Sequence, residues 1–134
     1  MIMRRVMVQW AAVAAGVGLS ALTSRAQSSA LDGRRFEGVF LQRGKTSGDA
    51  DTLTFAGGRF RSSACDRYGF GDAAYRAMAQ GDAIAFEAET ESAKYGKLVW
   101  RGTVRGGKLD ATALMQGPAG TAPIENWVVA VASN

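Results

Sequence analysis

Apolar and polar residues alternate along most of the chain beyond residue 35, in short runs separated by turn-forming residues. Three such runs follow one another between residues 81 and 115, and Arg105-Gly106-Gly107-Lys108 joins the last two. Two central glycines supply the positive φ that both positions of a type I′ hairpin turn need. The resulting register pairs Val104 with Leu109, Trp100 with Ala113 and Leu98 with Met115 on an apolar face, and Thr103 with Asp110 and Arg101 with Thr112 on a polar face. A single register that separates the two faces is what an antiparallel sheet requires.

A second hairpin is predicted around Ala56-Gly57-Gly58-Arg59, where Phe55 faces Phe60. Further strands are expected at 36–41, 84–91 and 126–132. The stretch 72–80 is interpreted as a strand or extended loop, with one or two helical turns as the alternative. The strand at 126–132 is apolar on both faces, which is typical of a strand that is covered on both sides or closes a sheet.

Seven or eight short, mostly hairpin-linked strands favour an all-β fold, an antiparallel up-and-down β-barrel with a β-sandwich as the alternative. Glu87 with Arg101, and Glu91 with Lys97, are expected to be cross-strand neighbours on its outer surface. The side chains predicted to point into the barrel are Phe36, Phe40, Leu53, Phe55, Phe60, Ile84, Phe86, Leu98, Trp100, Val104, Leu109, Met115 and Trp127.

The first 26 residues have the pattern of a secretory signal peptide. Arg4 and Arg5 precede an apolar run that extends from residue 6 to about residue 22, and Ser24 and Ala26 are the small residues of a cleavage site. A retained membrane anchor is the alternative, although the run contains polar residues and is short for a span. We therefore expect a cleaved segment 1–26, a loosely held lead-in 27–35, a barrel domain 36–134 and a periplasmic or secreted protein.

Charge and composition narrow the function classes. The chain carries a net charge of +4, which falls to +1 once Arg4, Arg5 and Arg25 leave with the signal segment. The remaining basic residues are scattered among acids, which argues against nucleic acid as a partner. The chain has no histidine and one cysteine, so it lacks a Ser-His-Asp triad, a Cys-His pair and the usual zinc ligands. We expect no catalytic residues, no metal site, no cofactor and no enzyme activity.

Five residues are the candidates for a ligand site. Cys65, Asp66, Tyr68 and Tyr75 lie close together in a stretch where Gly69 and Gly71 break the strand pattern. They are expected to form a polar cluster or structural plug at one end of the barrel, with Cys65 either reactive or buried and inert. Trp100 is the fifth candidate, because an aromatic ring can stack on a ligand or simply pack in the core.

The segments DTLTFAGGRFRSSACDRYGF, GDAIAFEAETES and GKLVWRGTVRGGKLDAT resemble a family of small exported bacterial β domains of uncharacterised function. The resemblance covers about residues 51 to 115, and it implies a barrel similar in shape to lipocalin-like (calycin-type) barrels. Where true lipocalins carry a Gly-x-Trp signature, this chain has Gly38-Val39-Phe40.

Two functions follow as expectations. The first is a non-catalytic interaction or structural module of the cell envelope, whose partner is an unknown envelope protein. The alternative is a carrier or binder of a small apolar ligand held in the mouth of the barrel. The volume of any internal cavity separates the two.

Overall fold

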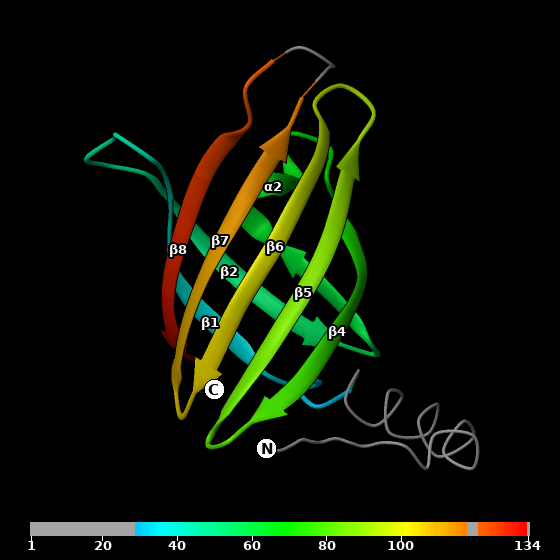
Figure 1. Cartoon of the computed structure of the whole chain (residues 1–134), viewed down its shortest axis with the longest axis vertical. Helices are drawn as coiled ribbons and strands as arrows, with labels where there is room; N and C mark the ends of the chain where they lie inside the picture. Colours follow the sequence, from blue (N-terminus) through cyan, green and yellow to red (C-terminus); the bar gives the residue numbers. More distant parts are fainter. Residues whose placement is uncertain (1–28, 118–120, 134) are drawn as a thin grey trace, which may run out of the picture.

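The computed structural model describes residues 29–117 and 121–133, and it is a closed antiparallel barrel in which each strand pairs with the next (Figure 1). β8 pairs back onto β1, so each of the described strands has a paired neighbour on both sides. This confirms the all-β barrel, a shape consistent with a lipocalin-like one, whereas the predicted signal segment 1–26 lies outside the described residues. The elements are β1 (Arg35–Gln42), β2 (Asp49–Ala56), β3 (Arg59–Ser62), α2 (Ser63–Asp66), β4 (Asp72–Gln80), β5 (Ala83–Ser92), β6 (Gly96–Arg105), β7 (Lys108–Gln116) and β8 (Ile124–Ala132).

The predicted registers are confirmed in both glycine-centred hairpins. Trp100 lies opposite Ala113 between β6 and β7, and Phe55 lies opposite Phe60 between β2 and β3. The stretch 72–80 forms β4, as the strand interpretation expected. Alternation fixes these registers because a slip by one residue would turn the apolar side chains out into water.

The two glycine pairs adopt different turns. Gly57 and Gly58 both have positive φ, at 59° and 77°, as a type I′ turn requires. In the second pair only Gly106 has a positive φ, at 59°. The prediction that Gly107 needs positive φ is therefore wrong, because a two-residue loop can also close with that conformation at its first position alone.

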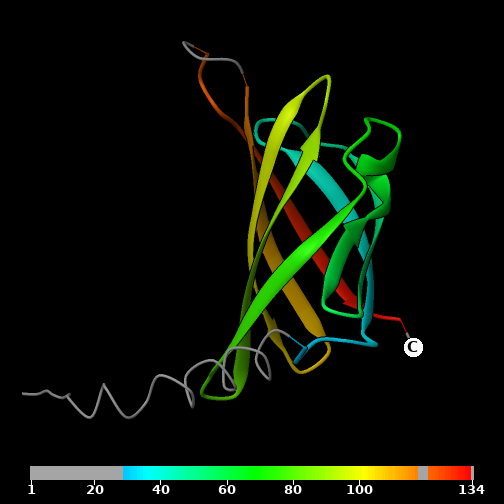
Figure 2. The same ribbon diagram turned by 90° about the vertical axis from the view of Figure 1, so that its right-hand side faces the viewer.

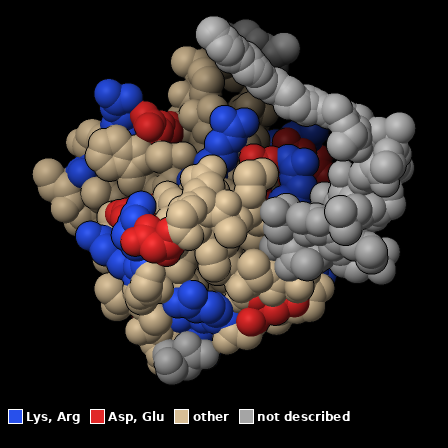
Figure 3. Space-filling model, turned by 60° about the horizontal axis from the view of Figure 1, so that its bottom comes forward, with Lys and Arg blue, Asp and Glu red and all other residues tan. Residues whose placement is uncertain are grey.

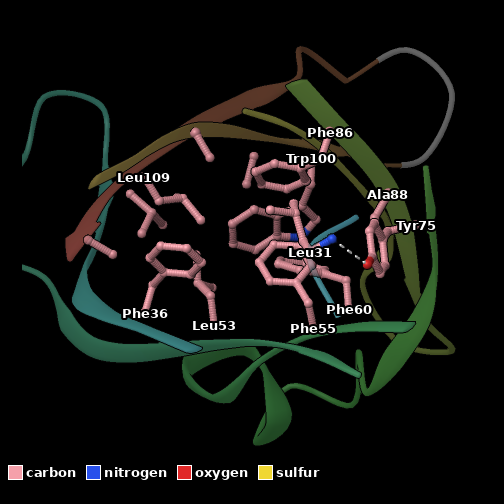
Figure 4. Packing of buried hydrophobic residues seen from close by; sticks show 14 of the residues in the cluster. Leu31, Phe36, Leu53, Phe55, Phe60, Tyr75, Phe86, Ala88, Trp100 and Leu109 are labelled. Atoms are coloured by element: carbon pink, nitrogen blue, oxygen red, sulfur yellow. Dashed lines mark hydrogen bonds between the residues drawn. The ribbon is translucent and has the colours of Figure 1, made fainter. Parts of the chain in front are cut away.

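The interior of the barrel is filled by aromatic rings (Figure 4). The ring of Phe55 lies 5.1 Å from that of Phe86 and 5.0 Å from that of Tyr75, while the ring of Trp100 lies 4.9 Å from that of Phe60. Edge-to-face pairs of this kind each add about 0.5–1.5 kcal/mol to the stability that burial provides. The middle of the barrel is thus a packed core.

Trp127 is the one predicted core residue that the structure places on the outside, with 45% of its surface exposed. It is level with Leu41 of β1, and the inward positions of β8 go instead to Asn126, Val128 and Ala130. Both faces of this strand are apolar, so polarity could not settle which one faces inward. The buried Asn126 is accommodated because its side-chain amide donates a hydrogen bond to the carbonyl of Ala113.

The described part of the lead-in closes one end of the barrel, although the sequence predicted a loosely held segment. Leu31 is fully buried, and its N–H donates a hydrogen bond to the Tyr75 hydroxyl. That hydroxyl donates in turn to Asp32, whose carboxylate also accepts from the N–H of Gly58. In Figure 2 the lead-in (blue) runs beneath the lower end of the barrel. We call this the lead-in end and the opposite one the α2 end.

Charged side chains of both signs are interspersed on the surface, as the lower face in Figure 3 shows. Glu87 and Arg101 are cross-strand neighbours as predicted, but the carboxylate of Glu87 pairs with Arg76 of β4. Lys97 lies 4.0 Å from Glu91. Exposed pairs like these contribute little to stability.

Candidate functional site

A pocket of about 510 Å³ opens at the α2 end of the barrel. Its position follows from the topology, because the inward side chains of several strands stop there and the long connections around residues 43–48 and 63–71 form a raised rim. The apolar lining consists of Phe40, Ala64, Cys65, Phe70, Leu98, Met115 and Ile124, and two tyrosines, Tyr68 and Tyr95, complete the aromatic part. The polar lining consists of Gln42, Lys45, Ser47, Asp49 and Asn126.

A buried carboxylate anchors the wall of this pocket. Asp51 is 2% exposed and accepts hydrogen bonds from the Ser62 hydroxyl at 2.8 Å and from the N–H of Ala64 at 3.0 Å. Ser63, whose hydroxyl lies 3.4 Å from the same carboxylate, also accepts from the N–H of Thr52. These bonds hold the start of α2 against β2, and they thereby fix the turn that carries Cys65 into the pocket.

Burial raises the pKa of Asp51, although its hydrogen bonds oppose the rise. A raised pKa in the folded state means that folding favours the protonated form. The contribution of this group to stability is therefore complete below the ordinary pKa of 3.8 and is lost as the pH rises through the higher value of the folded protein.

We expect Asp51→Asn to change how stability depends on pH. The amide keeps the shape of the carboxylate and can still accept from Ser62 and Ala64, but it does not titrate. As the pH falls from neutral towards 3.8, the wild type should gain stability relative to the variant. Urea unfolding at several pH values measures this difference, and a constant difference would contradict the assignment.

Cys65 is a buried thiol, with 4% of its surface exposed. Burial raises its pKa to about 11, so at neutral pH it is a protonated thiol and not a nucleophilic thiolate. The structure thus favours the interpretation of Cys65 as a small apolar residue of the pocket wall.

The rim is held in place by contacts between the loop that follows α2 and the end of β5 with its turn to β6. The rings of Tyr68 and Tyr95 meet edge to face at 5.7 Å, and the Ser92 hydroxyl donates to the carbonyl of Tyr68. On the β2 side of the mouth, Arg67 forms an ion pair with Asp49 at 3.0 Å. The entrance is therefore partly aromatic and partly charged.

Beneath the pocket lies Trp100, which is fully buried and contacts the ring of Phe40 at 5.9 Å. Among residues 29–117 and 121–133, its indole N–H has no hydrogen-bond partner, and neither has the buried hydroxyl of Thr90. Thr90 lies opposite Leu98 on β6, two residues from Trp100. Two polar atoms without partners therefore lie just below the pocket, each with a cost of about 1–3 kcal/mol.

The structure brings together only part of the predicted site. Cys65 and Tyr68 line the pocket, and Trp100 lies below it. Asp66 turns to the outside, where it pairs with Arg61 at 2.6 Å, and Tyr75 belongs to the closure at the lead-in end. The prediction of one cluster is therefore wrong for Asp66 and Tyr75, because the break after β3 sends these residues to different faces and ends of the barrel.

Sequence reasoning missed most of the pocket. Phe40, Leu98 and Met115 were expected to point inward, but nothing marked them as the last inward side chains before one end. The useful signal for Phe40 and Met115 was their proximity to the connections 43–48 and 117–123. Asp51 was missed because a carboxylate at the start of a strand usually indicates a solvated surface.

Within residues 29–117 and 121–133, no three Cys, Asp or Glu side chains are grouped so that they could hold a metal ion. In the same part of the chain, no helix has the length and apolar character to cross a membrane. Comparison with protein-family models, curated proteins and solved structures finds no match to this chain.

Proposed function

We propose that this protein binds a small, largely apolar molecule in the pocket at the α2 end and acts without catalysis. The pocket itself is the observation that carries the proposal. Its volume of about 510 Å³ lies within the range of small-molecule sites, which are concave and mostly apolar with a few polar groups. Because the opposite end is closed by Leu31 and its hydrogen bonds, a ligand would enter and leave at the α2 end.

The lining indicates which kind of ligand fits. The inner wall offers Phe40, Leu98 and Met115, which favour an aliphatic or aromatic body. Lys45 and Asp49 are the charged residues that line the pocket, and Asp49 also pairs with Arg67. A polar end of the ligand can lie beside them and remain in contact with water. The packed aromatic core below limits the ligand to the outer part of the barrel.

A titration with N-phenyl-1-naphthylamine, an uncharged fluorescent apolar probe, tests this proposal. Ile124 lines the mouth with 44% of its surface exposed, so Ile124→Trp should fill the entrance without disturbing the core. We expect the wild type to bind the probe, and the variant to bind it at least about tenfold more weakly.

Met78→Trp is the matched control, because Met78 is similarly exposed at 53% but lies on the outside of β4. This variant should bind like the wild type. A wild type that does not bind the probe, or equal weakening by both variants, would contradict a site in the pocket.

The exposed apolar residues on β1 and β8 favour a second candidate function, that of an interaction module. Val39, Trp127, Val129 and Val131 are each about half exposed. Together with the export signal expected in residues 1–26, they support the proposal that the protein works in a bacterial envelope through contacts with a protein partner.

A further inference from the structure

The exposed apolar side chains of β1 and β8 form one continuous feature, which we call the β1–β8 stripe. Val39 of β1 is level with Val129 of β8, and Leu41 is level with Trp127. Val131 extends the stripe towards the lead-in end, where it is level with Glu37. Val39, Trp127, Val129 and Val131 are 47%, 45%, 54% and 57% exposed, so the stripe presents adjacent apolar side chains to solvent on two paired strands.

Charged residues flank the stripe at its lower level. Glu37 lies on the β1 side of Val131, and Lys108 of β7 lies on the other side of the same residue. Both side chains are exposed. The carboxylate of Glu37 lies 4.0 Å from the guanidinium of Arg35, which is a weak ion pair. At the level of Val131 there is therefore an acid on one side and a base on the other, while the exposed Asp110 of β7 lies level with Val129.

We propose that the partner of the β1–β8 stripe is a second copy of this chain. A two-fold axis that runs along the stripe between β1 and β8 places β1 of one copy over β8 of the other. Val39 then lies over Val129 of the second copy, and Leu41 over Trp127. The same rotation places Glu37 of each copy over Val131 of the other, beside Lys108 on the adjacent strand β7 of that copy.

The shape of the barrel suits this arrangement. A barrel is convex, so two barrels that meet side by side touch over about two strands each, which is the width of the stripe. An interface of this kind lies at the small end of the range for specific complexes, so the dimer should be weak and depend on protein concentration. Its affinity comes from the apolar centre, whereas the two symmetric ion pairs fix the register.

This inference rests on the interaction-module function and is independent of the ligand pocket, which opens at the end of the barrel and not at its side. Sedimentation equilibrium of the purified protein from micromolar to millimolar concentration tests it. The wild type should show a reversible monomer–dimer equilibrium, and Val129→Lys should remain monomeric. Met78→Lys, the same change at an equally exposed residue across the barrel, should dimerise like the wild type.

Charge reversal tests the geometry. Glu37→Lys and Lys108→Glu should each weaken dimerisation by about fivefold, and the double variant should restore it. A wild type that is monomeric at every concentration overturns the proposal and leaves the probe titration unaffected. Dimers that withstand Val129→Lys, or a double variant no better than the single ones, also overturn it.

Discussion

Trp100→Ala should destabilise the protein by about 3–5 kcal/mol, a large share of the stability of a small domain. Trp100 is fully buried, and its ring packs against those of Phe60 and Phe40. Its neighbours belong to strands that are hydrogen bonded on both sides, so they cannot move in to fill the space. Urea unfolding followed by circular dichroism measures the loss as a lower transition midpoint.

Two control variants separate the sources of this loss. Arg101 lies on the outer face, so Arg101→Ala should cost less than about 1 kcal/mol. Trp100→Phe retains much of the ring volume and removes an N–H that has no partner in the described part of the chain, so its cost should stay below about 1.5 kcal/mol. If Arg101→Ala proved as damaging as Trp100→Ala, the packing of β6 described above would be wrong.

The fold was predictable because alternation and glycine-centred turns are local signals that agree with one another. Phe55 opposite Phe60 and Trp100 opposite Ala113 follow from counting outward from each glycine pair. The same reasoning fails for Trp127, since β8 is apolar on both faces and follows a long loop with no turn signature from which to count. Its orientation depends on pairing with β7 and with β1, the second of which is a contact between distant parts of the chain.

The site was less predictable, because it depends on which ends of the strands meet. Cys65 and Tyr75 are ten residues apart, yet they lie at opposite ends of the barrel because β4 begins between them. Leu31 closes the lead-in end through a hydrogen bond to Tyr75, although the polar sequence around it is typical of a loose segment. Contacts of this kind form only when the barrel closes, so they leave no pattern in the local sequence.

Closure of the barrel itself depends on Gly38 of β1. This residue lies opposite Ala130 of β8, in the strand pair that joins the two ends of the sheet. A Cβ atom at this position would overlap the carbonyl oxygen of Val129 and lie 2.7 Å from the Cα of Ala130. Both obstacles are backbone atoms, so no change of side-chain rotamer can relieve the overlap. A side chain here therefore has to force β1 and β8 apart.

We expect Gly38→Ala to cost about 3 kcal/mol or more, at or above the upper end for an overpacked interior, because strand hydrogen bonds must be distorted along with the packing. Gly107→Ala is the control: its added Cβ would meet only the Cβ of Ala132, at an ordinary 3.7 Å, and its backbone does not need positive φ. The free energy of unfolding of that variant should lie within about 0.5 kcal/mol of the wild-type value. Urea unfolding of both variants gives the comparison. Equal stability of Gly38→Ala and Gly107→Ala would mean that β1 and β8 do not approach as closely as this barrel requires.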